Sequence, residues 1–182
     1  MLHFHDIDTT TRYKRLRQEV TKADAEDPSL SYNPQNLKYL DAVIHEGLRM
    51  GMSTPTRIPR VVPSGGWSYG GYYFPAGTTV GCQPHTLHFN SNVFPDPFEF
   101  RPERWLDAPS SEMQRDWIPF SLGQRSCLAR NLAQAELQLA IRQVVREDLL
   151  ADAVAVGGEL EMHEWFNSKL AREKLEVSWQ ND

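Results

Sequence analysis

One of the two cysteines, Cys127, stands at the end of a glycine-containing loop and directly before an apolar-periodic segment that predicts a helix. The unpaired N–H groups at the start of a helix favour an anion, and Arg125 and Arg130 add positive charge nearby. These surroundings favour the thiolate, which is the form of cysteine that attacks electrophiles and binds metals. A thiolate can also hold haem iron. A buried structural cysteine after a turn is the alternative that this loop alone leaves open.

Three further charged residues could form ion pairs, with each other or with a bound carboxylate. Glu46 and Arg49 are three residues apart in a segment with helical periodicity, so their side chains share one face of the helix. Most pairs at this spacing are solvated ion pairs of little energetic value. Arg60 follows the same helix, and its planar guanidinium could pair with a carboxylate through two hydrogen bonds, or it could be solvated.

The segment around Cys127, Phe-x-x-Gly-x-Arg-x-Cys-x-Ala, resembles the haem-binding loop of the cytochrome P450 family, the haem-thiolate monooxygenases. Ala129 stands where the family usually has glycine, and we interpret it as a tolerated change. Three more motifs occur in the family's order: Glu-x-x-Arg at 46–49, Pro-x-Gly-Thr at 75–78 and Pro-Glu-Arg-Trp at 102–105. On these motifs the sequence is identified as a member of the family over residues 9–149.

The resemblance implies a haem b cofactor whose iron takes its axial thiolate from Cys127, with no other catalytic side chain in this chain. Arg125 and Arg60 would pair with the haem propionates, and Phe120 would pack against the porphyrin. His88 could reach a propionate, and a structural role is its alternative. The implied haem-contacting residues are Cys127, Arg125, Phe120, Gly123, Arg60 and His88.

The resemblance also assigns a structural role to Glu46, Arg49 and Arg104. In the family, the arginine of the Pro-Glu-Arg-Trp motif joins the helix Glu and Arg in a buried ion network behind the haem. We expect this network to fix the irregular segment that presents the cysteine loop, because removal of one member would leave a buried charge without its partner.

Composition limits the other possibilities. The chain has 182 residues with 40% hydrophobic and 24% charged residues, which suits one domain or a large part of one. A net charge of −5 gives no indication of nucleic-acid binding. Two cysteines without a paired framework favour a reducing, intracellular compartment. We see no run of 18 apolar residues, and the N-terminus lacks the pattern of a signal peptide.

The periodicity predicts a mainly α fold with a minor β part (α+β), which the resemblance specifies as the C-terminal, proximal-haem part of the cytochrome P450 fold. The last helix is expected to bury Leu128, Leu132, Ala135 and Leu139. The predicted elements are helices over 9–22, from 33–34 to about 48 and over 128–149, an extended segment over 51–63, a β-hairpin within 67–80 around Gly70-Gly71, an irregular stretch over 90–105 and a strand over 175–179.

The resemblance covers only the C-terminal portion of a family member, so we expect residues 1–182 to form a partial domain. The distal helix with its acid–alcohol pair, the membrane anchor and most of the substrate pocket are expected to be absent. Apolar faces that would pack on that missing half include parts of the stripes at 37–48 and 128–139.

Three functions follow from these expectations. The first is a truncated monooxygenase that inserts one oxygen atom of O2 into a small organic substrate, with electrons from a reductase bound on the cysteine side; its activity alone is doubtful. The second is a non-catalytic haem-binding or interaction protein, partnered by the missing N-terminal half or another chain. The third is a thiol enzyme with Cys127 as nucleophile, which lacks a histidine near Cys127 in the sequence.

Overall fold

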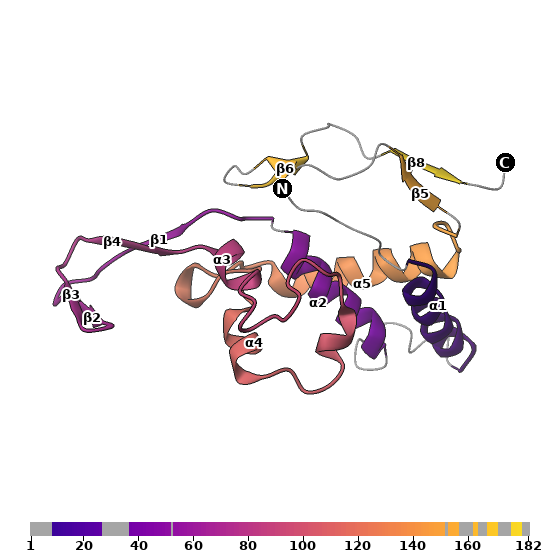
Figure 1. Cartoon of the computed structure of the whole chain (residues 1–182), viewed down its shortest axis with the longest axis horizontal. Helices are drawn as coiled ribbons and strands as arrows, with labels where there is room; N and C mark the ends of the chain where they lie inside the picture. Colours follow the sequence, from indigo (N-terminus) through magenta and orange to yellow (C-terminus); the bar gives the residue numbers. More distant parts are fainter. Residues whose placement is uncertain are drawn as a thin grey trace.

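The computed structural model describes residues 9–26, 37–51, 53–151, 153–156, 162–163, 167–170 and 176–179. Three long helices form the body of the structure, and an antiparallel β arm extends from it (Figure 1). The long helices are α1 (Thr9–Glu26), α2 (Lys38–Gly51) and α5 (Arg130–Arg146). The mainly helical class with small sheets is the one that the sequence predicts.

The main hydrophobic core lies where α1, α2 and α5 meet. Apolar side chains at helical spacing on α1 and α2, such as Leu16 with Val20 and Leu40 with Ile44, are almost completely buried there. The buried members are Leu16, Val20, Leu37, Tyr39, Leu40, Ile44 and Val145. The stripe at 37–48 therefore packs inside this structure, contrary to the expectation that part of it would be left exposed.

Helix α5 packs on the core with a different face from the predicted one. Leu128, Leu132 and Leu139 are 103%, 60% and 45% exposed, so the prediction that they form the buried face is wrong. The side chains that pack on the core are Leu137, Ile141 and Val145. Both sets repeat at helical spacing, and periodicity alone cannot decide which of two apolar faces meets the neighbouring helices. A second expectation, that part of the 128–139 stripe would be left uncovered, agrees with the exposure of these leucines.

The β arm consists of two antiparallel pairs. β1 (Ile58–Val61) pairs with β4 (Thr79–Cys82), and β2 (Trp67–Tyr69) pairs with β3 (Tyr72–Phe74). The predicted hairpin around Gly70-Gly71 is confirmed, because these two residues have φ values of 58° and 82° between paired strands. Two successive positive φ angles are what a two-residue hairpin turn requires.

Short elements connect the arm to the cysteine loop. They are α3 (Pro84–His88), η3 (Pro102–Trp105), α4 (Ser111–Asp116) and η4 (Gly123–Arg125). The proline-rich stretch at 90–105 is irregular as predicted, apart from the single turn of η3. The Ser110 hydroxyl accepts a hydrogen bond from the Met113 N–H at 3.2 Å and so caps α4.

Among the residues described after α5 there are four short strands. β5 (Ala153–Val156) pairs with β8 (Glu176–Trp179), and β6 (Met162–His163) pairs with β7 (Lys169–Leu170). The predicted strand at 175–179 corresponds to β8, whereas β5, β6 and β7 were not predicted. The predicted start of the second helix at 33–34 lies outside the described residues. Within the described part of the chain, no helix is long and apolar enough to span a membrane.

The packing makes a quantitative prediction. Leu40→Ala should lower the free energy of unfolding by about 2–5 kcal/mol, because it empties a fully buried position between helices. Leu139→Ala is the matched control, since this side chain is 45% exposed, and it should cost much less. Urea unfolding followed by circular dichroism measures both. A larger loss for Leu139→Ala would contradict the orientation of α5.

Candidate functional site

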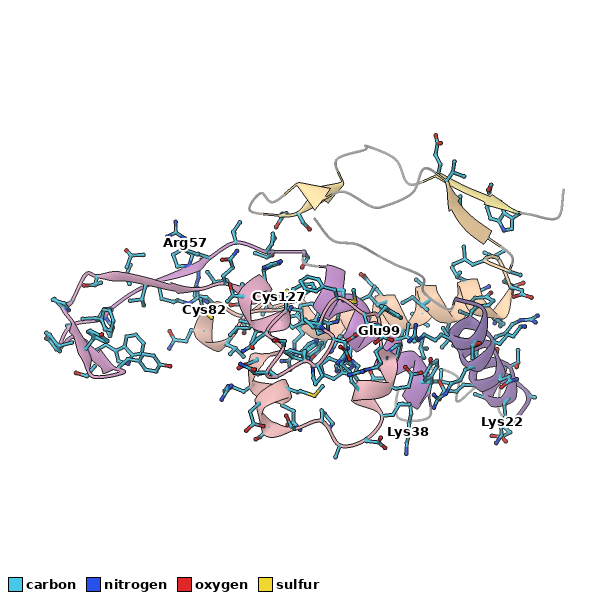
Figure 2. The ribbon with its side chains drawn as sticks, in the orientation of Figure 1. Lys22, Lys38, Arg57, Cys82, Glu99 and Cys127 are labelled. Atoms are coloured by element: carbon cyan, nitrogen blue, oxygen red, sulfur yellow. The ribbon has the colours of Figure 1, made fainter. Side chains whose placement is uncertain are left out.

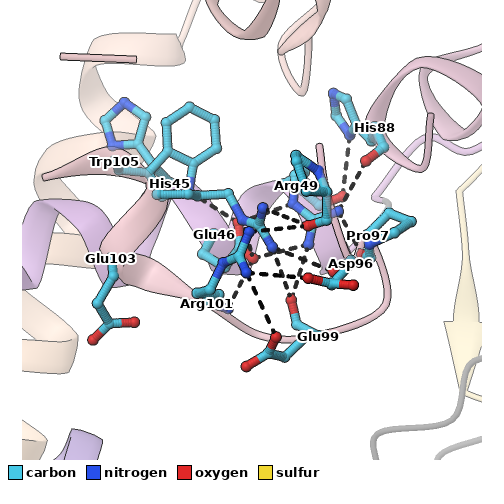
Figure 3. A network of polar contacts seen from close by, with 12 residues as sticks. His45, Glu46, Arg49, His88, Asp96, Pro97, Glu99, Arg101, Glu103 and Trp105 are labelled. Carbon is cyan, nitrogen blue, oxygen red and sulfur yellow. Dashed lines mark hydrogen bonds and ion pairs between the residues drawn. The ribbon is translucent and has the colours of Figure 1, made fainter. Parts of the chain in front are cut away.

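A single buried carboxylate, that of Glu46, accepts hydrogen bonds both from its own helix and from the irregular segment at 101–105. Glu46 is 0% exposed and pairs with Arg49 through two hydrogen bonds of 2.9 Å, to Nε and Nη2 (Figure 3). It also accepts hydrogen bonds from the Arg101 N–H at 2.9 Å, Arg104 Nε at 3.1 Å and Trp105 Nε1 at 2.9 Å. The structure thus brings Glu46, Arg49 and Arg104 together, although they come from two separate segments.

The two arginines extend these contacts to backbone carbonyls. Arg49 Nη1 donates to the carbonyl oxygens of His88 at 2.8 Å and Pro97 at 2.7 Å. Arg104 Nη1 donates to the carbonyl oxygen of Pro95 at 2.9 Å. Because this stretch has almost no secondary structure of its own, the arginines satisfy backbone groups that a helix or sheet would otherwise satisfy. The network therefore holds residues 95–105 against α2.

The charges in the network keep Glu46 ionised. Burial alone raises the pKa of the Glu46 carboxyl, but the hydrogen bonds and charge of Arg49 outweigh it, helped by the Arg101 N–H and the Arg104 charge. The pKa of Glu46 therefore lies below its usual range. A carboxylate with this environment stabilises the fold above its unfolded-state pKa and loses that effect as pH falls through the lower folded-state value.

His88 connects the network to the segment that leads into the cysteine loop. Its Nε2 accepts a hydrogen bond from the Ile118 N–H at 2.9 Å, so the proton of the neutral ring lies on Nδ1, which donates to the Arg49 carbonyl at 3.1 Å. Burial lowers the pKa of His88 to about 4, which agrees with a neutral ring. Both ring nitrogens have protein partners. These contacts match the structural role that is one of the two expected for His88. Contact of His88 with a haem propionate stays a prediction.

The cysteine loop is closed by its own backbone. The Cys127 N–H donates to the Phe120 carbonyl at 2.9 Å, and the Ser126 N–H donates to the Gly123 carbonyl at 3.0 Å. Gly123 has a φ of 71°, a conformation that glycine adopts without strain. Helix α5 begins at Arg130, so one turn separates Cys127 from the helix instead of the direct connection predicted. The Cys127 side chain is exposed and lies where the arm meets the helical body (Figure 2).

Arg60 reaches the same loop from β1. Its Nη2 donates to the Ser121 hydroxyl at 3.0 Å, and Nη1 donates to the Pro59 carbonyl at 2.9 Å. Ser121 itself has a φ of 62°, which is uncommon for a residue with a side chain. Sequence reasoning missed Ser121, because nothing in the motif marks this position as special. Arg125 lies within the loop on η4 and is exposed.

The chemistry of the loop's surroundings fits a haem. An exposed thiol is flanked by exposed leucines in the loop and in the first turns around α5, which a large apolar macrocycle could cover. The exposed Arg125 and the half-buried Arg60 supply guanidinium groups for carboxylates at the edge of such a ring. Phe120 is half-buried at the base of the loop. The exposed leucines are Leu122, Leu128 and Leu132.

The buried network makes a prediction about stability. Glu46→Gln removes the negative charge and leaves Arg49 and Arg104 buried without a counterion, so we expect a loss of about 3–5 kcal/mol in the free energy of unfolding. The matched control is Glu99→Gln, whose carboxylate is 46% exposed and pairs with Arg12, and which should cost at most about 1 kcal/mol. Denaturant unfolding compares the two, and equal losses would show that the network does not carry this stability.

The contacts of His88 predict a dependence on pH. Unfolded histidine gains its proton near pH 6.5, whereas folded His88 gains it only near pH 4. The stabilisation by neutral His88 is therefore complete above pH 6.5 and is lost as pH falls toward 4, by ~3 kcal/mol in total.

The variant His88→Gln should have a shallower fall in unfolding free energy between pH 6.5 and 4.5, measured by urea titration at each pH. An unchanged slope for His88→Gln would mean that His88 is not buried as a neutral ring.

Comparison with known proteins gives a consistent result. The sequence model of the family described as Cytochrome P450 matches residues 8–149. Cytochrome P450 monooxygenase mfmF of Annulohypoxylon moriforme is 41% identical over 97% of this chain and 36% of its own length. Pisatin demethylase of Fusarium vanettenii is 39% identical over 73% of this chain and 26% of its own length.

A solved structure shows the same similarity in three dimensions. The crystal structure of a cytochrome P450, CYP102L1, superposes with a TM-score of 0.69 and 27% identity, over 93% of this chain and 38% of that one. The chain thus spans 36% or less of the length of the curated relatives named above. It belongs to the cytochrome P450 family and corresponds to a portion of the family's fold.

Proposed function

We propose that this chain is the haem-binding portion of a haem-thiolate monooxygenase, with the Cys127 thiolate as the axial ligand of a haem b iron. The observation that carries the proposal is the exposed Cys127 side chain in a loop closed by the Cys127 N–H and the Phe120 carbonyl. The names of the relatives add support, since they include monooxygenases and a demethylase.

The chain's own residues would bind and orient the cofactor. Cys127 supplies the thiolate. The positive φ of Gly123 allows the sharp turn in the loop that precedes Cys127. Arg125 and Arg60 would hold the two propionates, with Arg60 already oriented by the Ser121 hydroxyl. Phe120 would pack beside the thiolate. The haem, when bound, supplies the activation of O2, for which a thiolate ligand favours cleavage of the O–O bond.

The complete reaction, insertion of one oxygen atom into a small organic substrate, needs more than this portion supplies. Proton delivery to oxygen and exclusion of water require a covered distal face. We propose that this cover comes from a further segment or from another chain. Electrons would come from a reductase on the cysteine side, where Arg125 and Arg130 are exposed. The free, exposed thiols of Cys82 and Cys127 support a reducing, intracellular compartment.

A second candidate function uses only the residues around the cysteine loop. The match covers 36% of the length of the monooxygenase relative, and the cysteine loop and the Glu46 network both lie within it. A non-catalytic haem-binding or interaction protein would need only the cysteine loop and the network behind it. The two functions share Cys127 as the haem ligand and differ in whether an organic product is formed.

The ligand assignment is tested with the purified chain and added haem. The reduced, carbon-monoxide-treated complex should show the red-shifted Soret band of thiolate-ligated iron, because Cys127 donates electron density to the metal. Cys127→Ser should abolish the band. Cys82→Ser is the matched control, since this cysteine is equally free and exposed, and it should keep the band. Retention of the band in Cys127→Ser, or its loss only in Cys82→Ser, would contradict the assignment.

A further inference from the structure

His45 precedes Glu46 on α2 and contacts two tryptophans of the segment that leads to the cysteine loop. Its ring stacks on Trp117, with 4.4 Å between the ring centroids. The Trp105 centroid lies 5.3 Å from that of His45 (Figure 3). The two indoles meet edge to face at 5.8 Å. This cluster joins α2 to η3 and to the residue that follows α4.

The ring of His45 is oriented by Asp41, which lies one helical turn before it. Nδ1 of His45 is 2.9 Å from the Asp41 carbonyl oxygen and 3.3 Å from Oδ2 of its carboxylate. A carbonyl and an ionised carboxylate only accept hydrogen bonds, so Nδ1 carries a proton and the proton that titrates joins Nε2. Burial alone lowers the pKa of His45, but the hydrogen bonds and charge of Asp41 outweigh it, and the pKa lies above its ordinary value of 6.5.

The other charged side chains of α2, η3 and α4 are engaged elsewhere or lie further along the chain. Lys38 is two helical turns before His45. The Glu112 carboxylate accepts a hydrogen bond from the Ser111 hydroxyl. The remaining groups form the ion pairs Glu46 with Arg49 and Arg104, Glu103 with Arg15, and Asp116 with Arg115. Within the described residues, Asp41 is therefore the carboxylate that contacts the His45 ring.

The charge on His45 changes how strongly the indoles are held. A cation is attracted to the electron-rich face of an aromatic ring, and most strongly to tryptophan, so a protonated His45 attracts the stacked Trp117 more than a neutral ring does. The indoles also remove the ring from water, which disfavours its charge, and the Asp41 carboxylate offsets that cost. The side chain is 24% exposed, so the ring can exchange a proton with water.

Trp117 lies where this attraction can act on the approach to the cysteine loop. Its Nε1 donates to the His45 carbonyl at 3.2 Å, and its neighbour Ile118 donates its backbone N–H to His88. We propose that His45 is a pH-dependent clamp, which in its protonated form tightens the attachment of residues 105–118 to α2. The effect concerns the loop that we propose binds haem, but it needs no haem.

The two histidines act in opposite directions of pH. A group held in its charged form stabilises fully below its unfolded-state pKa, and the effect is lost as pH rises through the higher folded-state value. His45 therefore loses its effect above neutrality, whereas His88 loses its own as pH falls from 6.5 toward 4. The attachment should accordingly be strongest near about pH 6.5.

An NMR titration of the histidine rings in the full chain, without added haem, tests the protonation of His45. The signal that is missing in His45→Gln identifies this ring, and its midpoint should lie above pH 6.5. Asp41→Asn should lower the midpoint, because burial then acts without the opposing carboxylate. The matched control Glu136→Gln removes an exposed carboxylate of α5 and should leave the midpoint unchanged. A wild-type midpoint at or below pH 6.5 would overturn the proposal.

The same titration shows whether the tryptophan favours the charge. Trp117→Leu keeps an apolar side chain against the ring but removes the aromatic face, so the His45 midpoint should fall. The control Trp67→Leu makes the same substitution on the β arm and should not move it. Circular dichroism verifies that each variant is folded. A midpoint that rises in Trp117→Leu would contradict the clamp, because the indole would then disfavour the protonated ring.

Amide exchange at Ile118 measures the attachment itself. Between pH 6.5 and 9 His88 stays neutral, so a change in this range reports on His45. The protection factor of the Ile118 N–H, corrected for the intrinsic effect of pH on exchange, should fall by about fivefold as His45 loses its proton, which is the size of one cation–π contact. His45→Gln should abolish the fall. Constant protection in the wild type, or the same fall in His45→Gln, would show that His45 does not act as a clamp.

Discussion

The buried ion pair of Glu46 with Arg49 is the interaction on which the rest of this structure depends. A charge removed from water is stable only if it is paired and its remaining hydrogen-bonding capacity is satisfied. Glu46 meets both conditions with donors from α2 and from residues 101–105. This requirement brings an irregular, proline-rich segment to a defined place beside a helix, which apolar packing alone does not do because packing is not directional.

A chain of hydrogen bonds leads from this pair to the cysteine loop. Arg49 and His88 are joined by two hydrogen bonds through each other's carbonyls, and His88 accepts from the Ile118 N–H. The Ile118 carbonyl then accepts from the Ser121 N–H, and the Ser121 hydroxyl accepts from Arg60. Each contact fixes the next backbone segment. The thiol that we propose as the haem ligand is therefore positioned by a carboxylate from another element.

Some of this arrangement could be predicted from the sequence, because certain residue types at fixed spacing have few other uses. Glu46 and Arg49 share a helix face by geometry, and the Pro-Glu-Arg-Trp motif identified Arg104 as the third member. The hairpin followed from Gly70-Gly71 between aromatic residues. The prediction of the buried face of α5 was wrong, because this helix has two apolar stripes with the same spacing. Only the neighbouring helices decide that Ile141 and Val145 face inward.

Other features could not be predicted because they depend on partners distant in the sequence. The positive φ of Ser121 and its contact with Arg60 arise only once β1 and the loop are in place. Sequence reasoning left two roles open for His88. Its contacts with Arg49 and Ile118, which lie on either side of it in the chain, describe the structural one.

The central claim is that the Glu46 network holds the cysteine loop in place, and amide hydrogen exchange at Cys127 tests it most directly. This N–H is protected by its hydrogen bond to the Phe120 carbonyl. The account predicts that Glu46→Gln speeds exchange at Cys127 and Ile118 under conditions where α1 and α5 remain protected. If the variant opened residues 95–105 while the Cys127 amide kept its wild-type protection, the loop would hold its shape alone and the account would be wrong.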